Sequence, residues 1–170
     1  MSELAETTQF LAGREPWSLL PPGEAAAYAR RATASYVRRG TQILTAGSPN
    51  SRMHVIRSGA VEVRDADGVL IDHDEEGHCF GQSSILEERP SRFTFTATED
   101  TLLWSFEAGV VRELVANPRV LRFFTESRLS DTTRQASEDG PVLQVAVADM
   151  ITRQPVTIDV ESTVGDAAVV

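Results

Sequence analysis

The sequence predicts a mainly β protein with flanking helices, whose body is an antiparallel barrel or jelly roll of about eight short strands. Two observations predict this class. From about residue 35 to residue 106 the apolar residues recur in short runs, and a glycine stands at nearly every corner between runs. On both sides of that region the apolar residues recur at helical spacing instead.

The N-terminal region, residues 1–33, is expected to consist of helices. Residues 3–12 carry a partial apolar stripe, and Gly13 is suited to end this helix. The turn at residues 16–20 carries large apolar side chains that are expected to dock on the body. An alanine-rich second helix is expected over residues 24–31.

The central region is expected to hold the strands. The short apolar runs are bounded by glycine, and the Asp67-Gly68 pair is typical of a hairpin turn. Strands are expected at residues 36–39, 42–45, 52–57, 60–64, 69–72, 93–98 and 101–106.

Two helices are expected after the strands. Residues 107–116 carry apolar residues on one face, and Asn117 and Pro118 are suited to begin a second helix that continues to about residue 136. Its apolar face is expected either to pack on the barrel or to form a dimer seam. Residues 34–137 are therefore assigned to the strand domain with its two C-terminal helices, and residues 138–146 to a linker.

One segment between the strands has the pattern of an anion site. Residues 80–94, called the 80–94 segment from here on, open with the turn Phe80-Gly81-Gln82 and continue with one helical turn. Backbone N–H groups at a helix start, together with the positive end of the helix dipole, attract anions. Arg92 is placed to add a bidentate phosphate contact. Ser83 and Ser84 fit two roles equally well, as phosphate donors or as plain helix caps.

Composition excludes several function classes. The chain of 170 residues is 41% hydrophobic, no apolar run approaches the ~18 residues of a membrane span, and the N-terminus lacks a targeting pattern. The net charge of −9 argues against broad nucleic-acid binding. The single cysteine, Cys79, excludes an internal disulfide, is expected to be a buried apolar group and fits a reducing cytoplasm.

No catalytic or metal site is expected in this chain. It contains no nucleophile elbow, no P-loop and no His-Glu zinc motif. Asp72, His73 and Asp74 are adjacent, but strand alternation places His73 on the face opposite its neighbours. These three side chains are therefore not expected to hold a metal ion.

The pattern from about residue 17 to residue 137 resembles the cyclic-nucleotide-binding domain of catabolite activators and cyclic-nucleotide-gated regulators. Phe80-Gly81 and Arg92 match that family's phosphate cassette at its spacing. Four glycines also fall where the family bends its strands: Gly40, Gly47, Gly59 and Gly77. The resemblance implies an eight-stranded antiparallel jelly roll, or double-stranded β-helix. It also implies a regulatory module, commonly a homodimer, that binds cyclic AMP, cyclic GMP or another nucleotide and needs no further cofactor.

The resemblance assigns the nucleotide to the 80–94 segment. The candidate binding residues are Phe80, Gly81, Gln82, Ser83, Ser84, Arg92, Phe93 and Thr94. Gln82 departs from the family pattern, because a glutamate there accepts a hydrogen bond from the ribose 2′-hydroxyl. Glutamine keeps an acceptor oxygen but loses the charge, which weakens the bond by about 1 kcal/mol, and helix capping is its alternative role. Phe93 replaces a small hydroxyl residue, and its ring either fills the pocket or stacks on a base.

The C-terminal segment, residues 147–170, resembles the first third of a CBS motif, a module that binds adenine nucleotides. This order of segments, and the sequence from Pro90 to Thr94, resemble bacterial signal-transduction proteins. In those proteins a cyclic-nucleotide-like domain precedes a CBS pair and a predicted nucleotidyltransferase. The chain stops within a predicted helix, which indicates a fragment boundary or a longer natural protein, and any transferase activity would lie beyond Val170.

Two function hypotheses follow. The first is a regulatory sensor in which a nucleotide phosphate lies on the N–H groups of residues 81–84 and on Arg92, and in which occupancy moves the C-terminal helices. The second is a degenerate domain that binds no nucleotide and serves as a dimerisation or interaction scaffold, which Gln82 and Phe93 favour. A transcription factor is the least favoured alternative, because the CBS-like tail occupies the place of a helix-turn-helix.

Overall fold

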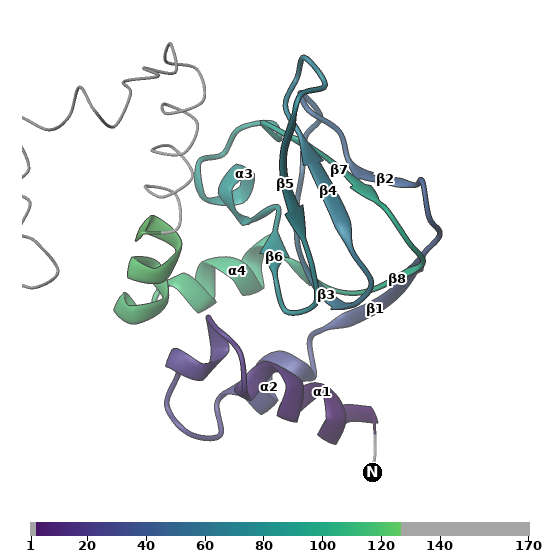
Figure 1. The fold of residues 1–170 in the computed structure, drawn as a ribbon. Helices are drawn as coiled ribbons and strands as arrows, with labels where there is room; N and C mark the ends of the chain where they lie inside the picture. The colour runs from purple at the N-terminus through teal and green to yellow at the C-terminus, as the bar shows by residue number, and fades with distance from the viewer. Residues whose placement is uncertain (1–2, 127–170) are drawn as a thin grey trace, which may run out of the picture. The chain divides into compact units, whose positions relative to one another are not determined.

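Two four-stranded antiparallel sheets form the body of the protein. The computed structural model describes residues 3–126, and the predicted fold class, mainly β with flanking helices, is confirmed. One sheet has the strand order β1-β8-β3-β6 and the other β2-β7-β4-β5 (Figure 1). The strands are β1 (Thr33–Val37), β2 (Gln42–Leu44), β3 (Arg52–Ser58), β4 (Val61–Arg64), β5 (Leu70–Asp74), β6 (Cys79–Phe80), β7 (Thr94–Ala97) and β8 (Thr101–Glu107).

Alternating side chains fill the space between the two sheets. Successive residues of a strand point to opposite faces, so in β4 Val61 and Val63 are buried while Glu62 and Arg64 are only half-buried. The buried apolar residues of this space form one set, called the interior cluster. It consists of Ile56, Val61, Val63, Phe80, Phe95 and Leu103.

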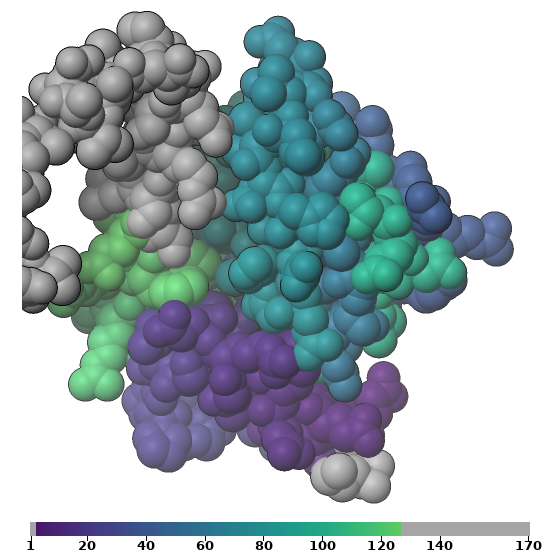
Figure 2. Space-filling model, in the orientation of Figure 1, coloured from purple at the N-terminus to yellow at the C-terminus, as the bar shows by residue number. Residues whose placement is uncertain are grey.

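Helices cover the other face of the β1-β8-β3-β6 sheet. A second set of buried apolar residues, called the outer cluster, joins Met53 and Val55 of β3 to Phe10 and Leu11 of α1 (Glu3–Ala12). The outer cluster also includes residues of α4 (Ala108–Val115). Strand β3 is therefore buried on both faces, which explains its run of four buried residues over 53–56. Figure 2 shows the purple N-terminal segments in direct contact with the teal strands.

The remaining helices are short. They are the 3-10 helix η1 (Trp17–Leu19), α2 (Ala25–Ala29), α3 (Gln82–Leu86) and the helical residues 118–126. The expected docking of the apolar turn is confirmed, because Trp17 is only 1% exposed. The expected N-cap is confirmed as well, since the Asn117 Oδ1 accepts the backbone N–H of Arg119 at 2.9 Å.

Most strands lie within one or two residues of the prediction, and two differ more. Strand β1 begins at Thr33 and ends at Val37, because the next residues form a corner. In that corner the N–H of Gly40 donates to the oxygen of Ala97 at 2.7 Å. Strand β6 has two residues, too few for a periodic pattern to reveal.

Part of the sequence prediction lies outside the described residues. This applies to the linker assigned to residues 138–146, to the CBS-like segment at 147–170 and to the last predicted helix beyond residue 126. Within residues 3–126, no helix is long and apolar enough to cross a membrane.

Candidate functional site

The 80–94 segment turns sharply at Gly81, between strand β6 and helix α3. Gly81 has a φ of +86°, a left-handed conformation in which an L side chain is strained. A Cβ atom added there would lie 2.6 Å from the backbone oxygen of Arg52. The conformation and the available space therefore both require glycine at the point where α3 begins.

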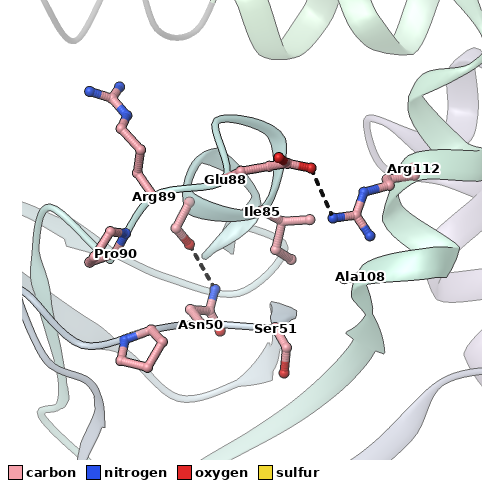
Figure 3. A pocket seen from close by; sticks show the side chains of 10 residues that line it. Asn50, Ser51, Ile85, Glu88, Arg89, Pro90, Ala108 and Arg112 are labelled. Carbon is pink, nitrogen blue, oxygen red and sulfur yellow. Dashed lines mark hydrogen bonds and ion pairs between the residues drawn. The ribbon is translucent and has the colours of Figure 1, made fainter.

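Asn50 holds the start of α3 from a neighbouring loop. Its Nδ2 lies 2.8 Å from the oxygen of Gly81, 2.9 Å from Oγ of Ser84 and 2.8 Å from the oxygen of Arg52. Its Oδ1 accepts the backbone N–H of Arg52 at 3.0 Å. Figure 3 shows the Asn50 amide directed at the helix. Because Gly81 has no side chain with which to cap α3, Asn50 supplies a polar contact from outside the helix.

Sequence reasoning missed the role of Asn50. Asparagine next to proline in the loop of residues 47–51 is an ordinary turn residue. Its partners Gly81 and Ser84 lie 31 and 34 positions further along the chain. No local pattern signals a contact of that range, so only the pairing of the strands reveals it.

The two serines of α3 differ in what their hydroxyl groups contact. Ser84 is buried, and its hydroxyl donates to the oxygen of Gly81 at 2.9 Å while accepting from Asn50. These contacts fix Ser84 against the turn, but they are not a helix cap, because the hydroxyl accepts no backbone N–H. Ser83 is half-buried, and within the described part of the chain its hydroxyl has no hydrogen-bond partner.

Gln82 carries a buried acceptor without a partner. The residue as a whole is half-buried, but its Oε1 is shielded from water and accepts no hydrogen bond from the described residues. A buried acceptor without a partner costs free energy, which a donor that reaches it would recover. Gln82 is the residue that the family resemblance assigns to a ribose hydroxyl.

Arg92 presents a cation at the other end of the segment. The residue is exposed, and its guanidinium carbon lies 5.5 Å from the centre of the Phe93 ring. Among residues 3–126 its side chain makes no hydrogen bond or ion pair. Neighbouring contacts hold its backbone: the Ser91 hydroxyl donates to the oxygen of Phe93 at 2.7 Å, and Oγ1 of Thr94 accepts the N–H of Ala46 at 3.0 Å.

The two phenylalanines of the segment belong to the space between the sheets. Phe93 is half-buried and packs against the interior cluster, as the pocket-filling alternative expects. Phe80 is 2% exposed and stacks on Phe95 with ring centres 4.6 Å apart. Its other neighbour is the ring of His54, at 5.2 Å. Phe80 therefore supports the turn from inside and has little surface to offer a ligand.

Two titratable groups lie behind the segment. Nδ1 of His54 lies 2.8 Å from Oγ of Ser105, and burial lowers the pKa of His54 to about 4, with a smaller contribution from the charge of Arg52. Burial raises the pKa of the Cys79 thiol to about 12, and the Asp74 carboxylate adds to the shift. Both groups are therefore neutral at pH 7. The described residues contain no group of His, Cys, Asp and Glu side chains that could hold a metal ion.

The candidate residues thus form two groups at the two ends of the segment. Gly81, Gln82 and Ser84 lie at the start of α3, where Asn50 contacts Gly81 and Ser84. Arg92 lies with Phe93 just before β7 begins. No hydrogen bond joins the Arg92 side chain to α3 within the described residues. Chemically, the first group offers an unused acceptor and the second an unused cation.

Fold and segment together define a class of protein, the two-sheet antiparallel jelly roll with a glycine-started helix between its sixth and seventh strands. Within that class one family model matches part of the sequence. Residues 34–117 match the family model described as the cyclic nucleotide-binding domain.

One curated relative matches most of this chain. It is the cAMP-dependent protein kinase regulatory subunit of Yarrowia lipolytica, which is 26% identical over 132 residues. The match covers 75% of this chain and 35% of the relative, so the chain spans about a third of that protein's length. The activity of a whole protein is therefore a separate question from the fold of this domain.

Solved structures share the fold at low sequence identity. The sensor domain of the transcriptional regulator DNR from Pseudomonas aeruginosa has a TM-score of 0.65 at 16% identity, covering 85% of this chain and 100% of that one. The regulatory domain of Toxoplasma gondii PKA with cAMP has a TM-score of 0.68 at 15% identity, covering 74% and 50%. The catabolite activator protein of Thermus thermophilus has a TM-score of 0.58 at 21% identity, covering 71% and 58%.

Proposed function

We propose that residues 34–117 are the sensor domain of a bacterial signal-transduction protein and that the 80–94 segment binds a nucleotide phosphate. The relatives support this proposal, because one is a cAMP-dependent kinase regulatory subunit and another was solved with cAMP. In this proposal the ligand is cyclic AMP, cyclic GMP or another nucleotide, and the domain itself performs no catalysis.

The buried, unpartnered Oε1 of Gln82 is the observation that carries the proposal. A sugar hydroxyl can donate to this oxygen, which removes the cost of leaving a buried acceptor unsatisfied. The same ligand would bring its phosphate to the N–H groups of residues 81–84 and to the unpaired guanidinium of Arg92, whose fork matches phosphate oxygens.

Helix α3 is the route by which occupancy would be signalled. Ile85 of α3 belongs to the outer cluster together with Val110 and Leu114 of α4. A ligand that draws α3 toward the phosphate therefore changes the packing of α4 and of the helical residues after it. We expect the signal to pass to the CBS-like segment and to domains that follow it, in a cytoplasmic homodimer.

The packing of Phe93 favours a second candidate. Its ring lies against the interior cluster, at the position where a small residue would leave room for a phosphate. If the ring excludes the nucleotide, the domain acts as a dimerisation or interaction scaffold.

Calorimetry on the full chain with cyclic AMP, cyclic GMP and cyclic dinucleotides tests the first candidate. Arg92→Ala is expected to weaken binding roughly tenfold to a hundredfold, because a hydrogen bond to a charged group contributes about 1.5–3 kcal/mol. Arg89→Ala is the matched control, since Arg89 lies on the same loop but pairs with Glu87. No heat with any ligand, or equal affinities of the wild type and Arg92→Ala, would overturn the sensor proposal.

Phe93→Ser separates the two candidates. A working sensor keeps or strengthens its nucleotide affinity when the ring is removed. If the domain is instead a scaffold, the wild-type chain binds no nucleotide. Light scattering then gives a dimer whose mass is the same with and without nucleotide.

A further inference from the structure

A cavity of about 360 Å³ lies between the loop of residues 49–51, helix α3, the loop of residues 88–90 and helix α4. It adjoins the 80–94 segment, and Ser84 and Ile85 of α3 line it. Ile85 packs in the outer cluster, whereas Phe80 and Phe93 pack in and against the interior cluster. The cavity therefore lies on the outer-cluster side of α3 and shares Ser84 with the proposed phosphate site.

One loosely partnered cation faces this cavity. Figure 3 shows the guanidinium of Arg112, on α4, directed at the carboxylate of Glu88 across the cavity rim. The two groups are 3.6 Å apart, and their side chains are 55% and 80% exposed. Charge-assisted hydrogen bonds measure about 2.7–2.9 Å, and exposed pairs contribute little. An incoming anion can therefore displace Glu88 from Arg112.

The Glu88 carboxylate has little else to hold it. Among the described residues its one ion pair is the 3.6 Å contact with Arg112, and its side chain makes no hydrogen bond.

The other lining groups select the kind of anion. Arg89 points away from the cavity in Figure 3 and pairs with Glu87, so Arg112 is the cation directed across it. Ser51 lines the cavity, and its hydroxyl, which can be brought round by rotation of the side chain, has no hydrogen-bond partner among the described residues. Ile85 and Ala108 supply apolar walls. The carboxylates of Glu87 and Glu88 on the adjacent loop disfavour a doubly charged phosphate.

We propose that this cavity is a second ligand site, which binds a small monocarboxylate with a compact apolar body. The carboxylate would replace that of Glu88 on the planar fork of Arg112 and accept a hydrogen bond from Ser51, while the apolar body contacts Ile85 and Ala108. The volume lies at the lower end of the range for small-molecule pockets, about 300–1,000 Å³.

Two-dimensional NMR on the isotope-labelled full chain tests this proposal. The probes are butyrate and benzoate, with butyramide and benzamide as uncharged counterparts of the same shape. We expect the acids alone to shift the amide signals of Ser51, Ile85 and Ala108 in a saturable way. Equal responses to acids and amides, no saturable shift, or shifts that map elsewhere would overturn the proposal.

Three variants sharpen the test. Arg112→Met is expected to weaken acid binding by about tenfold, because it removes the charged fork while keeping the apolar stem. Glu88→Gln is expected to strengthen binding severalfold, since it removes the competing carboxylate. Glu99→Gln changes the net charge equally but lies outside the cavity, and it is expected to bind as the wild type does. Equal affinities of Glu88→Gln and Glu99→Gln, or full binding by Arg112→Met, would also contradict the assignment.

Discussion

At the scale of single residues, Gly81 sets both the conformation and the clearance of the 80–94 segment. Gly81→Ala is expected to lower the free energy of unfolding by about 2–4 kcal/mol, because a left-handed alanine costs about 1–2 kcal/mol and overpacking adds about 1–3 kcal/mol. Gly68→Ala is the control: Gly68 has a φ of +83° but nothing within 4 Å of an added Cβ. Urea denaturation should therefore show only the conformational cost at Gly68, a loss of about 1–2 kcal/mol in the free energy of unfolding. Equal losses at both positions would show that the approach to Arg52 carries no cost.

The buried His54 predicts how stability depends on pH. Its pKa is lowered from an ordinary 6.5 to about 4, so between these pH values the histidine is protonated in the unfolded chain and neutral in the folded chain. The contribution of His54 to the free energy of unfolding is fully present above pH 6.5 and is lost as the pH falls from about 6.5 to about 4. Between pH 7 and pH 5 this contribution falls by about 2 kcal/mol.

His54→Gln removes that proton while keeping a polar partner for Ser105. The difference in unfolding free energy between pH 7 and pH 5 should shrink by about 2 kcal/mol in this variant. A slope unchanged by His54→Gln would show that this histidine takes up its proton equally well in the folded chain.

At the scale of elements, the start of α3 depends on the donor group of Asn50. Asn50→Asp replaces the donor with an acceptor that faces the oxygens of Gly81 and Arg52. We expect the free energy of unfolding to fall by about 2 kcal/mol and the α3 amides to exchange hydrogen faster. Asn117→Asp is the control, because Asn117 caps its helix only by accepting, and aspartate caps equally well. Similar behaviour of the two variants would contradict this role of Asn50.

Helix α1 is held by one face. Leu11 is 0% exposed within the outer cluster, whereas Leu4 on the same helix is 40% exposed. Leu11→Ala is expected to lower the free energy of unfolding by about 3 kcal/mol, and Leu4→Ala by less than about 1 kcal/mol. Thermal unfolding followed by circular dichroism compares the two. Equal effects would mean that α1 does not pack as a fixed part of the outer cluster.

At the scale of the whole molecule, the fold could largely be predicted because its signals are local. Strand β4 alternates over neighbouring residues, and the Asp67-Gly68 pair marks its hairpin without any distant contact. Strand β6 could not be predicted, because two residues carry no period. The order of strands in each sheet was not predicted, since pairing such as β1 with β8 joins residues far apart in the chain.

The candidate site was predictable in part for the same reason. Gly81 and Arg92 follow from a short pattern in the sequence, and the structure adds the conformation that requires the glycine. Asn50 could not be found, because its function arises only when the loop of residues 47–51 meets α3. That Gln82 keeps an orphaned oxygen depends on how its surroundings pack, which no spacing of residues encodes.

The protonated thiol of Cys79 has a practical consequence for spectroscopy. A thiol with a pKa of about 12 forms almost no thiolate at neutral pH, so maleimide dyes should leave the wild-type chain unlabelled. Mass spectrometry after brief exposure to maleimide checks this, and rapid labelling would show that β6 opens readily. Because Cys79 is the single cysteine, a variant such as Glu88→Cys can carry one dye in an otherwise natural sequence. Fluorescence from that dye can then report how the loop of residues 88–90 responds when either ligand is added.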